Sequence, residues 1–186
     1  PVFGVWAENV GALTIRNSRF IKLHGSDGFG AVGSCGNCPS GFLAHLAQDG
    51  AAAYGMHLSK VAAIDIFNTA LVDIRGGAKV EIGDSGLFTA AGDASCLFID
   101  DVDSISASIS CARIGLEPGH GTGILFDELQ QPFMVKNSVF SDIRGYCVRN
   151  APSNLPTDIT ISHSILHECE EGTQYNATEG LGISTD

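Results

Sequence analysis

Acidic residues recur at one place in a repeated sequence phrase, and their spacing suits acid/base chemistry. Glu81, Asp100 and Asp127 each follow a run of alternating apolar residues. If these runs lie one above another, the three carboxylates stack about 5 Å apart, with one on each layer. Hydrolysis of a glycosidic bond needs two carboxyl groups on either side of the bond. We therefore consider Glu81, Asp100 and Asp127 candidate catalytic residues.

The distance between the carboxyl groups decides what such a pair could do. Neighbouring layers would give the separation of a retaining glycosidase, and alternate layers one nearer that of an inverting enzyme. The alternative is a solvated turn edge without chemistry, because the chain has 21 acidic residues against 10 Lys and Arg. Both interpretations remain open from the sequence.

Five further residues flank these acids and are candidate substrate-binding residues. They are Asp101, Glu128, Arg149, Phe98 and Phe126. The first two form a second acidic pair beside the column, and the arginine closes one end of it. The two phenylalanines hold equivalent places in consecutive phrases and are expected to point outward. Such an exposed apolar patch marks a binding surface or, as we favour here, a subunit contact.

The elements that must position these residues are short strands. A phrase of a glycine followed by alternating apolar residues begins at Gly4, Gly28, Gly55, Gly77, Gly123 and Gly145, and a copy with cysteine in place of the glycine begins at Cys96. The six steps between positions 4 and 145 average 23.5 residues. Alternation with period two indicates strands, and a repeat of this length with short strands indicates a solenoid. We predict an all-β, right-handed parallel β-helix of about seven coils over residues 1–169, followed by an irregular tail over 170–186.

A second phrase places asparagine between two strands of a coil. Asn17, Asn68 and Asn137 hold this position, with His163 and Ile109 as departures. A sharp bend there needs a left-handed residue, which asparagine tolerates well. We expect the asparagine amides to form a ladder of hydrogen bonds from coil to coil.

The six cysteines leave the cellular compartment undetermined. Cys35 and Cys38 form a CxxC motif in a loop, and without a second such pair we expect a local disulfide or free thiols rather than zinc. The other four lie in apolar surroundings and are predicted to be small buried hydrophobic residues: Cys96, Cys111, Cys147 and Cys169. No metal or other cofactor is expected.

Charge and hydropathy exclude several partners. The net charge of −11 argues against a nucleic-acid surface, and no apolar run is long enough to cross a bilayer. We therefore expect neither nucleic-acid binding nor membrane insertion. Because the sequence starts at Pro1 without a signal peptide, we also expect a piece of a longer protein.

The glycine-led and asparagine phrases together resemble the right-handed parallel β-helix superfamily, the pectin-lyase-like fold. The resemblance covers about residues 4–169 and is one of pattern. Asp100-Asp101 and Gly119-His120-Gly121 follow the order of polygalacturonase motifs. Their register relative to the strands differs, so the catalytic residues of that family are not carried over.

Within this superfamily the chain is most similar to the rod of a virus tailspike. That resemblance implies an extracellular or virion-surface location, a polysaccharide partner and a homotrimer or larger assembly. It allows hydrolysis by paired carboxylates without requiring it. One alternative is a non-catalytic structural rod of a virion or cell-surface spike. Another is a carbohydrate-active enzyme that has lost its acids.

Overall fold

The computed structural model is all-β. It describes residues 1–31, 50–83, 86–115, 120–127, 133–150, 159–170, 172–174 and 183–185. Every helix or strand assigned within these ranges is a β-strand. Three long strands cross the molecule: β1 (Val2–Arg16), β4 (Ala53–Arg75) and β7 (Ala94–Ile114). The shorter strands are β2 (Arg19–His24), β3 (Gly28–Ala31), β5 (Ala78–Gly83), β6 (Gly86–Ala91), β8 (Gly121–Asp127), β9 (Phe133–Lys136), β10 (Val139–Ile143), β11 (Gly145–Asn150), β12 (Ile159–Ser162), β13 (Ile165–Cys169), β14 (Gly172–Gln174) and β15 (Ile183–Thr185).

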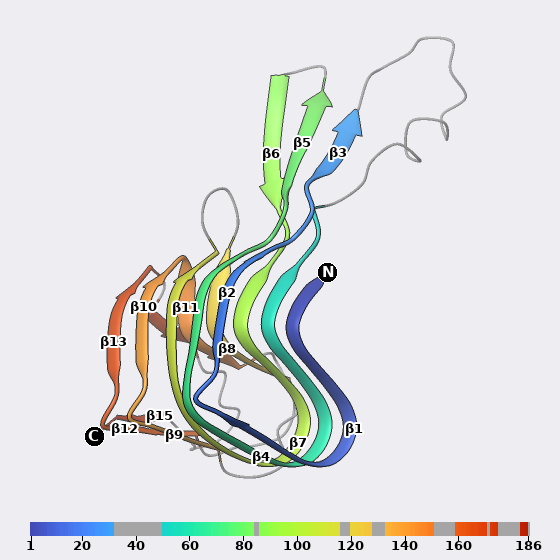
Figure 1. Cartoon of the computed structure of the whole chain (residues 1–186). Helices are drawn as coiled ribbons and strands as arrows, with labels where there is room; N and C mark the ends of the chain where they lie inside the picture. Colours follow the sequence, from blue (N-terminus) through green and yellow to red (C-terminus); the bar gives the residue numbers. More distant parts are fainter. Residues whose placement is uncertain are drawn as a thin grey trace.

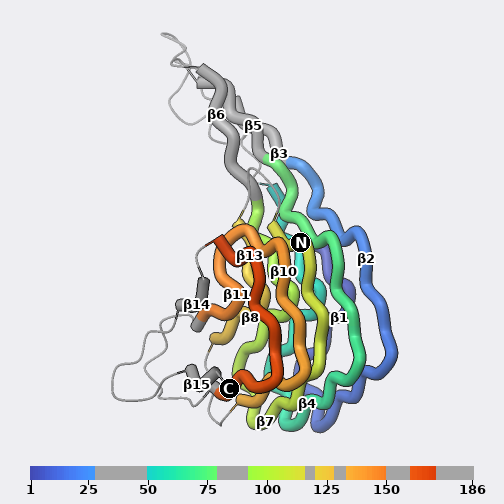
Figure 2. Tube along the Cα trace, turned by 90° about the vertical axis from the view of Figure 1, so that its left-hand side faces the viewer, coloured from blue at the N-terminus to red at the C-terminus, as the bar shows by residue number. Residues whose placement is uncertain are grey.

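The main sheet has 12 strands and is parallel throughout its described ladders. Strand β4 pairs along nearly its whole length with β7, and on its other side with β1 and then β2. Strand β7 then pairs with three short strands in turn, β8, β9 and β10. Figures 1 and 2 show these bent strands side by side, with β1 and β2 at one end and β13 at the other. The long parallel sheet expected from the repeat is confirmed.

Two of the repeated phrases lie outside the main sheet, which differs from the prediction. The phrases at Gly28 and Gly77 were expected to be coils of the same stack, but they lie in a separate three-stranded sheet of β3, β5 and β6. In that sheet β5 pairs in parallel with β3 and antiparallel with β6, which is a hairpin. The remaining glycine-led phrases stack on β1, β4, β7, β8 and β11, so two of the seven predicted coils do not lie in the main sheet. Strands β14 and β15, which pair with β11 and β12, lie within the range predicted as an irregular tail.

The bends in the strands occur at left-handed residues that share columns. One column is Asn9, Lys60 and Asp101, with φ of 57°, 53° and 49°. Another is the asparagine column, where Asn17, Asn68 and Asn137 have φ of 49°, 47° and 49° and His163 follows with 51°. A third column of left-handed residues was not predicted from the sequence. Its members are all charged: Lys22, Asp73, Arg113, Asp142 and Glu168. The left-handed role of the asparagines is thus confirmed.

The asparagine ladder is confirmed where it is continuous. Asn68 Nδ2 donates a hydrogen bond to Asn17 Oδ1 at 2.9 Å. At β7 the ladder stops for a reason other than the one expected. Ile109 was predicted to replace asparagine, but the register shifts, so that Thr69 pairs with Ile109. Between these paired residues β4 has two residues, Phe67 and Asn68, whereas β7 has only Ser108. No residue of β7 therefore occupies the asparagine position.

The connections that follow the third left-handed column vary widely in length. They join β2 to β4, β4 to β7, β7 to β8, and β10 to β11. The connection ranges from residues 25–52 for the first of these to the single residue Arg144 for the last. Backbone hydrogen bonds still cross the bend from layer to layer, from Gly25 N to Arg75 O, Gly115 N to Ile74 O, and Arg144 N to Ile114 O. The layers therefore keep their register whatever the length of the connection.

The core lies inside the bent strands and is continuous. Side chains at inward positions are fully buried on β4, β7 and β8, as for Met56, Leu97 and Ile124 in one column. On β1 the corresponding Val5 is only partly buried. Burial of these apolar columns supplies the main favourable term for folding.

Four cysteines, predicted only as small buried hydrophobic residues, form two disulfides. Cys96 bonds to Cys111 across the two ends of β7, and Cys147 bonds to Cys169 between β11 and β13. Cys35 and Cys38 lie outside the described residues. Disulfides persist in oxidising compartments, so this pair of bonds is typical of an extracellular protein.

Glycine and half-cystine alternate in one inward column. Flanking pairs align Gly55 with Cys96, Cys96 with Gly123, and Gly123 with Cys147. At the glycine layers large side chains reach across the core instead of a disulfide. A Cβ on Gly55 would stand 2.3 Å from Leu71 Cδ2 and 2.5 Å from the Cys96 carbonyl oxygen. Glycine is therefore required here by close approach.

Replacing Gly55 with alanine should destabilise the fold. The added methyl group would meet both a packed side chain and a backbone atom, and overpacking of this kind costs about 1–3 kcal/mol. The measurement is the free energy of unfolding in urea. Gly11→Ala is the matched control, because a Cβ there meets nothing within 4 Å. Equal stability of the two variants would contradict the packing argument.

Candidate functional site

The candidate site lies on the outer surface formed by the first parts of β1, β4 and β7 together with β8. Side chains alternate along these strands, so Ile99 and Phe126 point into the core while Asp100 and Asp127 point outward. Residues at the same place on successive strands form columns perpendicular to the strands. Two outward columns carry the chemistry of this surface, one acidic and one aromatic.

The acidic column runs through Glu8, Ser59, Asp100 and Asp127, which pair in that order. Ser59, nearly buried, donates a hydrogen bond from Oγ to Asp100 Oδ2 at 2.8 Å. Asp100 and Asp127 are directly opposite one another on adjacent parallel strands. The structure therefore brings together two of the three predicted catalytic carboxylates.

The third predicted acid belongs to another part of the molecule. Glu81 lies on β5, where its partners are Gly30 of β3 and Phe88 of β6. The sequence alignment placed it in the column because its glycine-led phrase was counted as one more coil. Strand pairing thus separates Glu81 from Asp100 and Asp127.

The predicted acidic substrate-binding pair is only partly described. Asp101 is a left-handed residue with φ of 49°, at the bend that follows the acidic column. Glu128 lies outside the described residues. Asp101 lines a groove of about 430 Å³ together with Asn9, Lys60 and Asp103, and with the backbone between them. This groove runs beside the acidic column because its residues directly follow Glu8, Ser59 and Asp100 in the chain.

Arg149 does not close the acidic column as expected. Its partner on β8 is Leu125, two residues before Asp127. The guanidinium instead lies over the ring of Tyr146, 5.2 Å from the ring centroid. It stands in the column of Trp6, His57 and Phe98, on the same outer surface but at a different height along the strands.

The two phenylalanines predicted to point outward have different places. Phe98 is partly exposed and stacks on His57. Phe126 is fully buried and packs edge-on against Phe133, with ring centroids 4.4 Å apart. Its partner in the ladder is Ile99 rather than Phe98. A shift of one residue reverses the side to which a strand residue points, which explains the error.

An aromatic cluster lies beside the acidic column. It consists of Phe3, Trp6, Tyr54, His57 and Phe98. The rings of Phe3 and Tyr54 stack at 5.5 Å with an interplanar angle of 12°, and those of His57 and Phe98 at 4.7 Å with 9°. Trp6 contacts both Phe3 and His57 and is 62% exposed. Trp6 is therefore the most exposed ring of the cluster.

Of these five residues, only Phe98 was predicted from the sequence to lie on a binding surface. A usable signal was present, because an aromatic residue directly precedes the glycine of two phrases, at Phe3 before Gly4 and Tyr54 before Gly55. His57 was not predicted, because only the pairing of β4 with β1 and β7 places it beside these rings and near the carboxylates of Asp100 and Glu8.

Burial within the aromatic cluster lowers the pKa of His57. The nearby carboxylates of Asp100 and Glu8 act in the opposite direction but do not reverse the shift. The Nδ1 atom of His57 is buried without a hydrogen-bond partner among the described residues. The imidazole is therefore neutral near pH 7 and contributes an apolar ring to the cluster.

The lowered pKa of His57 predicts a pH dependence of stability. The unfolded chain takes up a proton at this residue below its ordinary pKa of 6.5, while the folded chain does so only at lower pH. The contribution of His57 is therefore complete above pH 6.5 and is lost as the pH falls through the folded pKa. His57→Phe should flatten the decline in melting temperature between pH 7 and pH 5. An unchanged slope would contradict this assignment.

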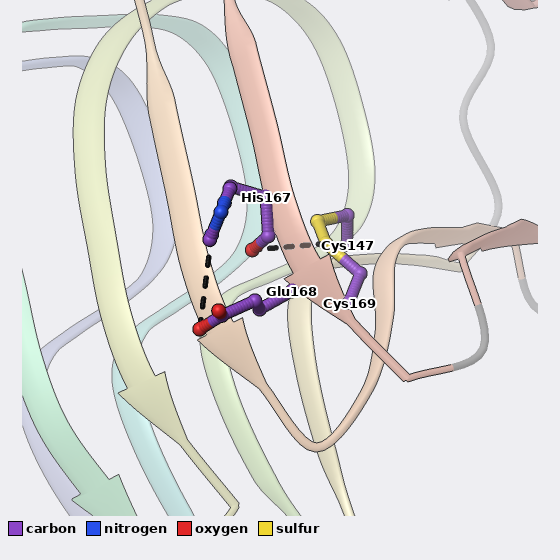
Figure 3. Close-up of a disulfide and its surroundings, with 4 residues drawn as sticks. All are labelled: Cys147, His167, Glu168 and Cys169. Atoms are coloured by element: carbon purple, nitrogen blue, oxygen red, sulfur yellow. Dashed lines mark hydrogen bonds and ion pairs between the residues drawn. A yellow bond between two sulfur atoms is a disulfide. The ribbon is translucent and has the colours of Figure 1, made fainter.

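A second concavity lies beside the Cys147–Cys169 disulfide, at the end of the molecule that β13 occupies. It measures about 450 Å³ and is lined by Asp142, Ile143, Arg144, Glu168, Cys169 and Glu170. Figure 3 shows Glu168 next to His167, whose Nδ1 is 3.7 Å from the Glu168 carboxylate. Both side chains are largely exposed, so this ion pair contributes little to stability.

Two searches of the described residues returned nothing. In that part of the chain no three His, Cys, Asp or Glu side chains are placed to hold a metal ion. The same residues contain no helix that is long and apolar enough to span a bilayer.

Comparison with known proteins gives no relative. No family model, no curated protein and no solved structure matches this chain.

Proposed function

We propose that the parallel sheet is the wall of a right-handed parallel β-helix of the tailspike kind. Three features support this. Strand β4 takes part in three ladders and β7 in four, equivalent residues recur on each layer, and left-handed residues mark the same bends. Parallel strands of one sheet are joined by right-handed crossovers in nearly all proteins.

We propose that the outer surface with the aromatic cluster and the acidic column binds a polysaccharide. The observation that carries this proposal is their adjacency. Trp6 offers an exposed ring on which a sugar face can stack, and Asp100 and Asp127 offer acceptors for sugar hydroxyls on the neighbouring column. Convergent polar groups beside apolar rings are typical of sites for small molecules and sugar units.

Hydrolysis by this surface is the finer part of the proposal. Asp100 and Asp127 stand on adjacent strands, which are about 4.8 Å apart. That spacing approaches the separation of about 5–5.5 Å between the carboxyl groups of a retaining glycosidase. One carboxylate would attack the anomeric carbon while the other, as the acid, protonates the leaving oxygen. Water would then release the sugar, with the second residue acting as base.

Binding can be tested with a panel of bacterial and plant polysaccharides. Trp6→Ala should weaken binding of the best ligand at least tenfold in a titration calorimeter, because it removes the exposed ring. Ile21→Ala is the matched control, since Ile21 is 50% exposed on β2 and lies outside this surface. Equal losses in both variants, or none in either, would count against the site.

Hydrolysis has a separate test. If a bound polysaccharide is cleaved, Asp100→Asn and Asp127→Asn should each abolish release of reducing ends while leaving binding measurable. Unchanged rates would remove these residues from the mechanism. If binding occurs without cleavage, the surface recognises the glycan and does not cut it.

The assembly proposed with this function is a homotrimer or larger. Val139 and Ile165 support a subunit contact because they are paired neighbours on β10 and β13 and are 37% and 60% exposed. Light scattering gives the mass directly. A protein that binds no polysaccharide would favour the alternative, a non-catalytic structural rod at a virion or cell surface.

A further inference from the structure

The gap in the asparagine ladder is hollow. On β7 no residue occupies the asparagine position between Asn68 and Asn137, because the strand has one residue fewer than β4 at that bend. The space left is a surface notch of about 140 Å³. Its lining consists of Asn68, Thr69, Ala70, Ser108, Ile109, Ser110, Asn137 and Val139.

The notch keeps the hydrogen-bonding groups that a missing amide would have used. Asn68 Nδ2 already donates to Asn17 Oδ1, so its own Oδ1 is the atom that would accept from the next layer. On the far side, the side-chain amide of Asn137 has no hydrogen bond within the described part of the chain, and its N–H groups remain available to donate. One acceptor and one donor thus face a cavity of the size of a small group.

Two polar groups at the floor and rim of the notch already make hydrogen bonds. Ser108 Oγ donates to the Asn137 carbonyl oxygen at 3.4 Å, and the Ile109 amide donates to Ser138 Oγ at 3.0 Å. Ala70 and Val139 add apolar surface. Phe67, the residue before Asn68, is 55% exposed.

We propose that this notch binds the acetamido group of an N-acetylated amino sugar, an inference that rests on the proposed polysaccharide recognition. An acetamido group has one N–H donor and one carbonyl acceptor, which complement Asn68 Oδ1 and the Asn137 amide. Its methyl group matches the apolar surface of Val139 and Ala70. The sugar ring would lie outside the notch, on the side of the Phe67 ring.

The binding test compares sugars that differ only in the acetamido group. Oligosaccharides of N-acetylglucosamine and N-acetylgalactosamine are titrated into ¹⁵N-labelled protein, beside glucose and galactose oligosaccharides of equal length. We expect the N-acetylated ligands to bind at least ten times more tightly. They should also shift the side-chain NH₂ signals of Asn68 and Asn137 selectively.

Two variants locate the effect in the notch. Insertion of one asparagine between Ala107 and Ser108 should fill the gap with the missing amide and remove the preference for N-acetylated sugars. Asn137→Asp keeps the size and the left-handed tolerance of the residue but removes the N–H donors, and should weaken N-acetylated ligands at least tenfold. Asn17→Asp is the control, because Asn17 holds the same column position away from the notch.

The possible results separate this inference from the function on which it rests. Binding of sugars without a preference for the acetamido group would overturn the notch site and leave polysaccharide recognition standing. Binding of no sugar would overturn both. A preference that survives the insertion and Asn137→Asp would place the acetamido group elsewhere. Signal shifts at the notch with a glutamine-containing peptide alone would overturn the sugar assignment in favour of a protein partner.

Discussion

Phe126→Ala is expected to lower the free energy of unfolding by about 3–5 kcal/mol, the largest single effect predicted for this chain. Phe126 is fully buried and packs against Phe133 at 4.4 Å between ring centroids. Truncation would remove the contacts of a whole ring and leave a cavity between two ladders of the sheet. Equilibrium unfolding in guanidinium chloride, followed by circular dichroism, measures the difference.

The control for this prediction is Trp6→Ala on the outer surface. Trp6 is 62% exposed, so its removal should change stability by less than about 0.5 kcal/mol while weakening any polysaccharide binding. The sequence pattern gave Phe126 and Phe98 the same role, and the pair Phe126 and Trp6 now separates stability from binding. A small stability loss for Phe126→Ala would show that this ring is not in the core.

Replacing both Cys96 and Cys111 with alanine is expected to cost about 3 kcal/mol, because the disulfide closes a loop of 15 residues in the unfolded chain. The double variant also loses the sulfur atoms that fill the core on the layer of β7. Thermal unfolding should show a melting temperature several degrees lower. Both effects act on folding and do not involve the acidic column.

A reductant provides the internal control for the disulfide. Dithiothreitol should lower the melting temperature of the wild type, and less so that of the double variant, which retains only Cys147–Cys169 among the described disulfides. If reduction leaves the wild type unchanged, these bonds do not stabilise the folded state. Equal shifts in both proteins would assign the whole effect to the other disulfide.

The sequence predicted strand direction and bends better than it predicted layers. Alternation with period two is a local signal, so strands were found, and the left-handed preference of asparagine is local as well. The order in which the phrases stack on one another depends on the path of the chain between them, which is not a local signal. Gly28 and Gly77 open phrases of the right type, yet their strands pair with each other and with β6 instead of joining the main sheet.

The candidate site shows the same division. Asp100 and Asp127 were placed correctly because their phrases lie on consecutive layers without an intervening excursion. Glu81 was misplaced for the opposite reason. The disulfides were missed because a buried cysteine in an apolar strand has the same sequence context whether or not a partner faces it across the core. Cys96 and Cys111 are neighbours only because β7 bends twice between them.

The connections that follow the third left-handed column suggest a practical use of this chain. Their lengths vary from the single residue Arg144 to the whole of 25–52, yet the layers on both sides remain hydrogen-bonded in register. A foreign peptide grafted at Arg144, where the native connection is shortest, should thus be displayed without unravelling the scaffold. Several such grafts, one on each layer, would be spaced about 4.8 Å apart along the sheet. The spacing of the displayed peptides would then be set by the backbone itself.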